Sequence, residues 1–227
     1  MAIRPFVLLS VATSVDGHID DTSPDRLLLS NSADFDRVDQ VRAESDAILI
    51  GGNTLRSDNP RLLVNSDKRR ADRVAAGKPE YPLKVTVSGS GDLSRELKFW
   101  HFGDRKVVYT TNSAAAKVRA ELDGLADVVS TGEVVDFGVL LDDLATRGVE
   151  RLMVEGGGRI HTQFLSQGLV DEVHLAVAPL VVGDAAAPRF LHPADYPGGS
   201  TRRMRLLGVE TVGDVALLRY APKQESA

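Results

Sequence analysis

The chain has 227 residues, no cysteine, 43% hydrophobic residues and a formal net charge of −5. This length suits one large α/β domain, or at most two small ones, and the apolar fraction is sufficient for a substantial core. The absence of cysteine excludes disulfides, thiolate zinc sites and a cysteine nucleophile, and the acidic balance argues against a general nucleic-acid binder. The five histidines are scattered without metal-ligand spacing, so we expect no bound metal.

Targeting and membrane signals are weak in this sequence. The N-terminal apolar run is short and is interrupted by Pro5, and no segment has the length of a membrane span. We therefore expect a cytoplasmic protein. We also expect a single domain over residues 1–221 and a frayed tail over residues 222–227.

The chain begins with alternating strand and helix patterns. Phe6–Thr13 predicts a strand that leaves through the turn-forming residues Ser14–Gly17. A helix capped by Asn31 or Ser32 comes next, with apolar positions at Phe35, Val38 and Val41. Ala47–Ile50 predicts the second strand. The basic run Lys68–Arg70, with Arg73, indicates a solvated loop or a short helix.

The same alternation continues through the middle of the chain. Short apolar runs predict strands at Val85–Val87, Lys106–Thr110 and Asp127–Val129, and a helix over Ser113–Leu122. The next helix has apolar residues at helical spacing and is stopped by Gly148; these residues are Phe137, Leu140, Leu141 and Leu144.

The last third begins with a strand, Arg151–Val154, and a helix that buries Ile160, Phe164 and Leu165 and ends at Gly168. The alternation predicts an α/β fold with a mostly parallel central sheet flanked by helices. The three final strands have no helix between them, which predicts antiparallel strands at one edge of the sheet. They are Val173–Ala178, Met204–Val209 and Val215–Tyr220.

The first candidate site follows the strand Ala47–Ile50 and runs from Gly51 to Leu62. Glycine allows the backbone to approach a phosphate closely, and Thr54 can donate a hydrogen bond to it. Asp58 can supply a proton or hold a sugar hydroxyl, and Arg61 can bind a phosphate through two hydrogen bonds. The alternative is an ordinary strand-to-turn connection in which Asp58 only caps the turn.

The second candidate site is Glu155–Gly158, where a strand passes into a helix. The exposed N–H groups and the positive end of the helix dipole favour a bound anion there. Ligands of open α/β sheets bind at the carboxyl ends of strands, which strengthens this interpretation. Glu155 would then face an amino or hydroxyl group of a substrate. Alternatively, Glu155 caps the helix and the glycines only form a tight turn.

Taken together, these segments resemble the pyrimidine reductases of riboflavin biosynthesis, the reductase domain of the bifunctional deaminase-reductases. The resemblance covers about Phe6 to Tyr220 and rests on several blocks in the family's order. The blocks are Ser14–Gly17, Arg42–Gly51, Thr54–Leu62, Val154–Gly158, Gly168–Val173 and Ala178–Gly183.

The resemblance implies a dihydrofolate-reductase-like fold, NADPH as the hydride donor and a homodimer. It also implies the reduction of 5-amino-6-(5-phosphoribosylamino)uracil, or of its 2,5-diamino pyrimidinone counterpart, to a ribitylamino product. Hydride would reach C1′ of the sugar in its open, imine-like form. The cysteine and histidine ligands of the deaminase domain are absent from this sequence.

The resemblance also assigns roles to individual residues. Asp58 would lie between nicotinamide and ribose and relay the proton. Residues that would contact the cofactor are Ala12, Thr54, Asp58, Ser88, Gly156, Gly157, Gly158, Arg159 and Ile160. Residues that would contact the substrate are Arg42, Arg61, Leu62 and Glu155, with the two arginines on its phosphate.

Two positions depart from the family pattern. His18 stands where members often carry a basic residue after the Asp-Gly turn, and Asn65 replaces a second arginine. These departures leave open a related NADPH-dependent reductase acting on a pterin, dihydrofolate or another imine. A further alternative is a nucleotide-binding protein without catalytic activity.

Overall fold

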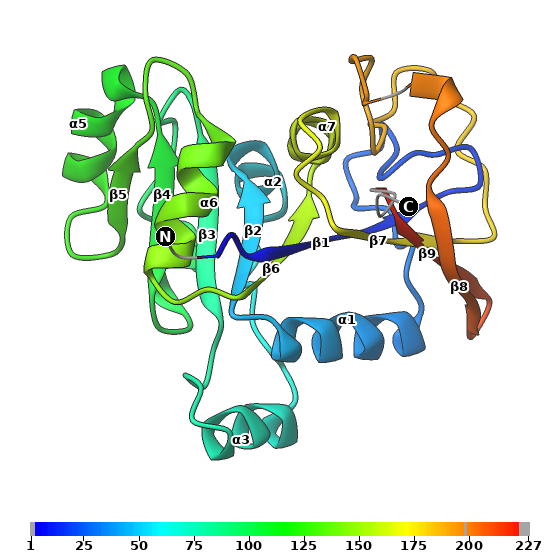
Figure 1. The fold of residues 1–227 in the computed structure, drawn as a ribbon, viewed down its shortest axis with the longest axis horizontal. Coiled ribbons are helices and arrows are strands. Elements are labelled where there is room, and N and C mark those ends of the chain that lie inside the picture. Colours follow the sequence, from blue (N-terminus) through cyan, green and yellow to red (C-terminus); the bar gives the residue numbers. More distant parts are fainter. Residues whose placement is uncertain (1–2, 198, 223–227) are drawn as a thin grey trace. The chain divides into compact units, whose positions relative to one another are not determined.

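The structure is a computed structural model that describes residues 3–197 and 199–222. Within these residues, nine strands form a mixed sheet in the order β5-β4-β3-β2-β6-β1-β7-β9-β8 (Figure 1). This confirms the predicted mostly parallel sheet with antiparallel C-terminal strands. Residues 223–227 of the predicted tail lie outside the described part of the chain. No helix among the described residues is both long and apolar enough to cross a membrane.

The chain divides into two compact units. The first comprises Asp39–Met153 with the N-terminal residues as far as Pro5, and the second comprises Phe6–Val38 and the chain from Val154 onward. Helix α1 (Ser32–Glu44) and strand β6 (Arg151–Gly156) each run through a boundary between the units.

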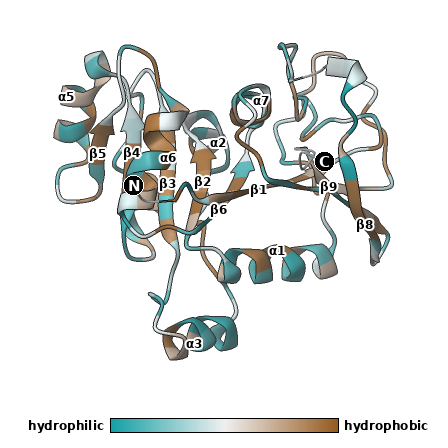
Figure 2. Ribbon diagram, viewed as in Figure 1, coloured by the Kyte–Doolittle hydropathy of each residue, from teal (hydrophilic) through white to brown (hydrophobic). Residues whose placement is uncertain are grey.

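The first unit is built on four parallel strands. They are β2 (Ala47–Gly51), β3 (Leu83–Ser88), β4 (Lys106–Thr110) and β5 (Asp127–Ser130). Every residue of β2 and β3 is buried, as expected for parallel strands covered on both faces. The apolar character of β2 is visible in Figure 2. The helices of this unit are α2 (Gly52–Asp58), α3 (Asp67–Ala75), α4 (Lys98–His101), α5 (Asn112–Glu121) and α6 (Phe137–Thr146).

Helix α6 shows how the sequence sets the boundaries of an element. The Asp136 carboxylate accepts hydrogen bonds from the N–H groups of Gly138 and Val139, which caps the helix start. The four predicted apolar positions, from Phe137 to Leu144, are all buried. The chain leaves the helix through Gly148 at φ +80°, a conformation that favours glycine.

The second unit contains β1 (Phe6–Thr13) parallel to β7 (Glu172–Val177). Strand β9 (Val215–Ala221) is antiparallel to both β7 and β8 (Arg205–Val212). Helix α7 (Gly158–Ser166) and a short 3₁₀ turn (Gly199–Thr201) complete the unit.

Some details differ from the sequence-based expectations. Phe35 is 50% exposed although it was expected on the buried face of α1, whereas Val41 is buried. The strand expected over Val173–Ala178 runs parallel to β1 and is antiparallel only to β9. The basic run forms the short helix α3, in which Arg73 is buried and donates to the carbonyl oxygens of Ala43 and Ser45. Helices α2 and α4 were not predicted.

Strand β3 carries a charged side chain into the core of the first unit. Lys84 is 1% exposed, and its Nζ donates to the carbonyl oxygen of Arg61 at 2.8 Å and to that of Phe99. The ammonium also lies 4.3 Å from the centre of the Phe99 ring. Burial, with a smaller contribution from nearby Lys106, lowers the pKa of Lys84 from 10.5 to about 7.

The lowered pKa of Lys84 predicts a pH-dependent stability. Between pH 7 and 10.5 the unfolded chain keeps the Lys84 proton while the folded chain releases it, so the free energy of unfolding should rise with pH in this window. The free energy of unfolding of the native protein should rise between about pH 7 and pH 9. This rise should exceed that of Lys84→Met by about 1–3 kcal/mol. Urea unfolding of both proteins across this range measures the difference. Parallel pH profiles would contradict the prediction.

Candidate active site

The first candidate site begins where β2 passes into α2. Gly51 pairs with Val87 in the neighbouring strand, so β2 and β3 end side by side. A Cβ added to Gly52 would lie 3.1 Å from the Ser88 Cβ and 3.2 Å from the Val87 carbonyl oxygen. A side chain at Gly52 would therefore require its neighbours in β3 to move by a few tenths of an ångström. The structure thus brings the start of α2 beside Ser88.

The start of α2 has the features of an anion-binding turn. Its N-cap residue, Gly51, makes no side-chain cap, so the first N–H groups of the helix are not satisfied by a capping side chain. Thr54 lies in the first turn and is partly exposed. Asp58 ends the helix on the surface, where its carboxylate accepts a hydrogen bond from Ser57 Oγ. The helix then stops at Asn59, which adopts the left-handed conformation.

The loop of residues 61–66 connects α2 to α3 and takes many of its hydrogen bonds from charged side chains. Arg42 Nη1 donates to the Leu63 carbonyl oxygen at 3.0 Å, and the Asp39 carboxylate accepts from the N–H groups of Asn65 and Ser66. Arg70 Nη1 donates to the carbonyl oxygens of Val64 and Asn65, and Lys84 holds that of Arg61. These bonds fix the loop that follows Asp58.

The predicted substrate residues of this loop present different groups. The Arg61 side chain is exposed, and its guanidinium lies 5.6 Å from the centre of the Phe102 ring. Leu62 has φ +51° and is 5% exposed, so its side chain belongs to the core and only its backbone is available to a ligand. Arg42 uses one guanidinium nitrogen to hold Leu63.

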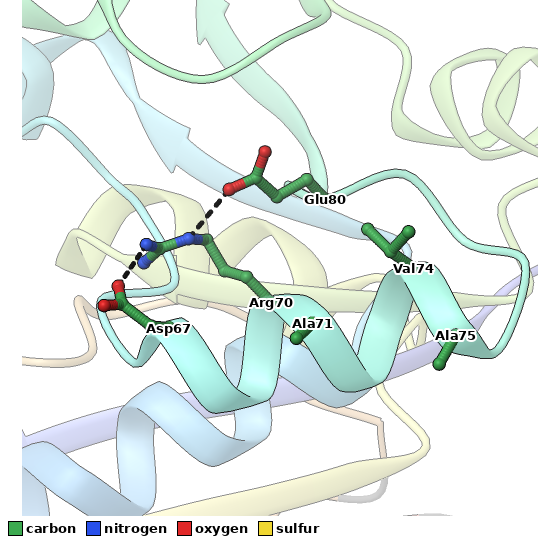
Figure 3. A pocket seen from close by; sticks show the side chains of 6 residues that line it. All are labelled: Asp67, Arg70, Ala71, Val74, Ala75 and Glu80. Carbon is green, nitrogen blue, oxygen red and sulfur yellow. Dashed lines mark hydrogen bonds and ion pairs between the residues drawn. The ribbon is translucent and has the colours of Figure 1, made fainter.

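A surface hollow beside α3 is lined by Asp67, Arg70, Ala71, Val74, Ala75 and Glu80 (Figure 3). Arg70 forms ion pairs there with Asp67 and with Glu80, the latter at 2.9 Å between Arg70 Nε and Glu80 Oε1. None of the residues that line this hollow belongs to the predicted site. Arg70 is thus engaged by two carboxylates and by the 61–66 loop.

The second candidate site lies where β6 passes into α7. The Gly156–Gly157 peptide bond is cis, and the N-cap residue Gly157 makes no side-chain cap. The N-cap position of α7 is thus occupied by Gly157 and not by Glu155. A Cβ on Gly158 would lie 2.2 Å from the Arg189 carbonyl oxygen. Only glycine admits the segment around Arg189 this close to the start of α7.

The buried His161, which packs against this turn, was not predicted. Gly156 has φ +129°, and a Cβ added there would lie 3.1 Å from the imidazole ring. Burial lowers the pKa of His161 to about 4, which leaves the ring neutral at pH 7. Of the two remaining predicted residues of the turn, Arg159 is exposed and Ile160 is buried in the core.

The remaining predicted residue of the second unit, Ala12, lies near the end of β1. Ala12 pairs with Ala176 of β7 and is partly exposed. The turn that follows is closed by Asp16, whose carboxylate accepts from Ser14 Oγ and from the N–H groups of Val182 and Gly183, which lowers its pKa. His18 is 1% exposed, with Nδ1 3.2 Å from the Ala187 carbonyl oxygen.

The predicted residues therefore fall into two groups. The first unit holds Arg42, Thr54, Asp58, Arg61, Leu62 and Ser88, and the second holds Ala12, Glu155, Gly156, Gly157, Gly158, Arg159 and Ile160. Sequence reasoning missed Lys84, although a single lysine in an apolar strand was a usable signal. No group of three or more histidine, aspartate or glutamate side chains among the described residues could hold a metal ion.

Comparison with known proteins defines the class. Residues 5–218 match the family described as the RibD C-terminal domain. Solved structures of this kind share the fold: Acinetobacter baumannii RibD (form 1) superposes with a TM-score of 0.78 at 24% identity, over 97% of this chain and 59% of that chain. A pyrimidine reductase-like protein from Corynebacterium diphtheriae superposes with a TM-score of 0.77 at 23% identity, over 97% of this chain and 93% of that chain. The fold is thus that of the dihydrofolate-reductase-like reductases.

The chain belongs to the RibD C-terminal domain family, which confirms the resemblance read from the sequence. Two archaeal relatives match it over nearly their whole length, and both are named 2,5-diamino-6-ribosylamino-4(3H)-pyrimidinone 5′-phosphate reductase. The protein from Archaeoglobus fulgidus is 34% identical over 93% of this chain and 95% of its own. The protein from Methanothermobacter thermautotrophicus is 36% identical over 97% of this chain and 100% of its own.

The close approach at Gly158 predicts the effect of adding a methyl group. Gly158→Ala should lower the free energy of unfolding by about 1–3 kcal/mol, because backbone must move to admit the new Cβ. Gly89→Ala is the matched control, since no heavy atom lies within 4 Å of a Cβ at Gly89. Urea unfolding measures both variants. Equal stability of the two variants would contradict the close approach.

Proposed function

We propose that the protein is an NADPH-dependent oxidoreductase that reduces 2,5-diamino-6-ribosylamino-4(3H)-pyrimidinone 5′-phosphate, or its 5-amino uracil counterpart, in riboflavin biosynthesis. The observation that carries the proposal is the match to two relatives of that name over 93% or more of this chain at 34% and 36% identity. The proposed product is the ribitylamino compound, in which C1′ of the sugar has become a methylene group.

Each unit, taken by itself, has residues that suit part of a phosphate-bearing cofactor. Two helices, α2 and α7, start at glycines without side-chain caps. A Cβ at Gly158 would not fit, and one at Gly52 would make tight contacts with β3. Such turns suit phosphate groups. Within the first unit we assign cofactor contacts to Thr54, Ser88 and Asp58. Within the second unit we assign them to Ala12 and Gly156–Ile160. When bound, NADPH supplies the hydride.

The chain's own polar residues would carry the remaining tasks. Arg61, exposed and held over Phe102, would bind the substrate phosphate, and Arg42 would add a second positive charge. Glu155 would accept hydrogen bonds from the pyrimidine or the sugar. Asp58 would pass a proton to the sugar oxygen or nitrogen as the open, imine-like form is reduced at C1′. No metal is needed for this chemistry.

The role of Asp58 predicts a specific loss of turnover. Asp58→Asn keeps the shape of the side chain and its bond with Ser57 but removes the transferable proton, so kcat should fall by about 10²–10⁴-fold. NADPH oxidation, followed by absorbance with the purified phosphorylated pyrimidine, measures this fall.

Asp72→Asn, a change at another exposed carboxylate of the first unit, serves as the control for the Asp58 variant and should leave turnover unchanged. Near-normal turnover of Asp58→Asn would remove Asp58 from the chemistry. Wild-type activity with a pterin, dihydrofolate or another imine, but not with the pyrimidine, would favour the alternative reductase.

The proposal includes a homodimer. Strand β8 lies at the end of the strand order, and part of it is coloured as hydrophobic in Figure 2. Two of its residues, Leu206 and Val209, are 54% and 59% exposed. An apolar edge strand with unpaired backbone groups favours association with another strand. We therefore assign the contact with a second copy to β8. The reaction also uses a cofactor of the cell interior, in keeping with the predicted cytoplasmic location.

The edge strand predicts how the dimer can be separated. Leu206→Lys with Val209→Lys should convert it to a monomer at micromolar concentration, because two buried apolar side chains would become charged. Light scattering coupled to gel filtration gives the mass. Val134→Lys, at a 74% exposed valine of the first unit, is the control and should leave the mass unchanged. A double variant that stays dimeric would place the contact elsewhere.

A further inference from the structure

Lys84 connects two backbone segments that are distant in sequence. Its Nζ donates to the carbonyl oxygen of Arg61, at 2.8 Å, and to that of Phe99. An ammonium group has three donors and no acceptor, so it can bridge two carbonyl oxygens. Because Lys84 is only 1% exposed, water does not compete for these bonds.

The same two segments also meet through their side chains. The Arg61 guanidinium lies 5.6 Å from the centre of the Phe102 ring. Phe102 lies three residues after Phe99, in the same segment of the chain. Gly103 packs closely against both Leu63 and Lys84. A Cβ added to it would lie 3.2 Å from Leu63 Cδ2 and 3.8 Å from Lys84 Cε. Arg61 is therefore held at its backbone by Lys84 and at its guanidinium by Phe102.

We propose that Lys84 is a positioning residue that fixes the Arg61 guanidinium for the phosphate of the substrate. This inference rests on the proposed function, which places Arg61 on that phosphate. A flexible arginine loses rotamer freedom when it binds an anion, so an arginine already held in place binds with a smaller entropic loss. Lys84 supplies this order from the core, without contacting the ligand.

Lys84 differs from the other charged side chains that hold the 61–66 loop. Arg42 and Arg70 bind carbonyl oxygens farther along, at Leu63, Val64 and Asn65. Lys84 binds the carbonyl of Arg61 itself and also anchors the segment that carries the Phe102 ring. Its removal should therefore affect Arg61 at both ends.

Order at Arg61 can be measured without substrate or cofactor. The ¹H–¹⁵N heteronuclear NOE of the Arg61 Nε–H group, assigned through Arg61→Lys, reports its mobility on the picosecond to nanosecond timescale. We expect a high NOE in the wild type and a clearly lower one in Lys84→Met. Tyr109→Phe is the control: it removes the bond from the buried Tyr109 hydroxyl to Asp143 in the same unit and should leave Arg61 ordered.

An unchanged NOE in Lys84→Met would overturn the proposal. Lys84→Gln, whose shorter side chain does not span both carbonyl oxygens, replaces Lys84→Met if that variant does not fold, and the same outcomes apply to it.

Kinetics supply the second test. Lys84→Met should raise KM for the phosphorylated pyrimidine about 10-fold with kcat within about twofold, and should leave KM for the phosphate-free analogue unchanged. When Lys84→Met is added to Arg61→Ala, KM should rise by less than about twofold relative to Arg61→Ala alone, because Lys84 acts through Arg61. Unchanged KM, or fully additive effects, would overturn the inference. If the wild type does not oxidise NADPH with this substrate, the proposed function fails, and the NOE still decides whether Lys84 orders Arg61.

Discussion

The connection between α2 and α3 depends on charged side chains for its hydrogen bonds. The 61–66 loop belongs to no helix or strand, so its backbone groups need partners from elsewhere in the unit. Lys84 supplies the deepest of these bonds from inside strand β3, and Asp39, Arg42 and Arg70 supply others. Burying an ammonium is costly, which explains the lowered pKa of Lys84, and the two carbonyl oxygens compensate part of that cost. The position of the predicted phosphate-binding arginine follows from this arrangement.

A second constraint is steric and operates in each unit separately. At Gly158 the chain approaches the carbonyl oxygen of Arg189 at a distance that excludes a side chain, and at Gly52 it approaches Ser88 at a distance that leaves little room for one. Both glycines begin helices whose first N–H groups have no side-chain cap. The same residue type therefore permits close packing and leaves polar backbone groups available to an anion. The proposal of a phosphate-bearing cofactor rests on this pairing of close approach and helix starts without a side-chain cap.

The sequence predicted elements well where one local signal dominated. The apolar run of β1 and the helical spacing of α6 each led to the observed element, because burial is read directly from composition and period. Helix α2 was missed because its glycines and the Asn59-Pro60 pair are typical of turns. The family blocks identified the strand ends, but they could not reveal long-range partners. Lys84 and His161 act through contacts with residues far along the chain, and no local pattern encodes such contacts.

The proposed reaction delivers the hydride to C1′ of the sugar. The most direct measurement is a single turnover with NADPH that carries deuterium at the transferable position of the nicotinamide, followed by mass spectrometry and NMR of the product. We expect one deuterium on C1′ of the ribityl chain and none on the pyrimidine ring. Deuterium on the ring, or a product without deuterium, would contradict the assignment of this chain as the reductase of the ribosylamino group.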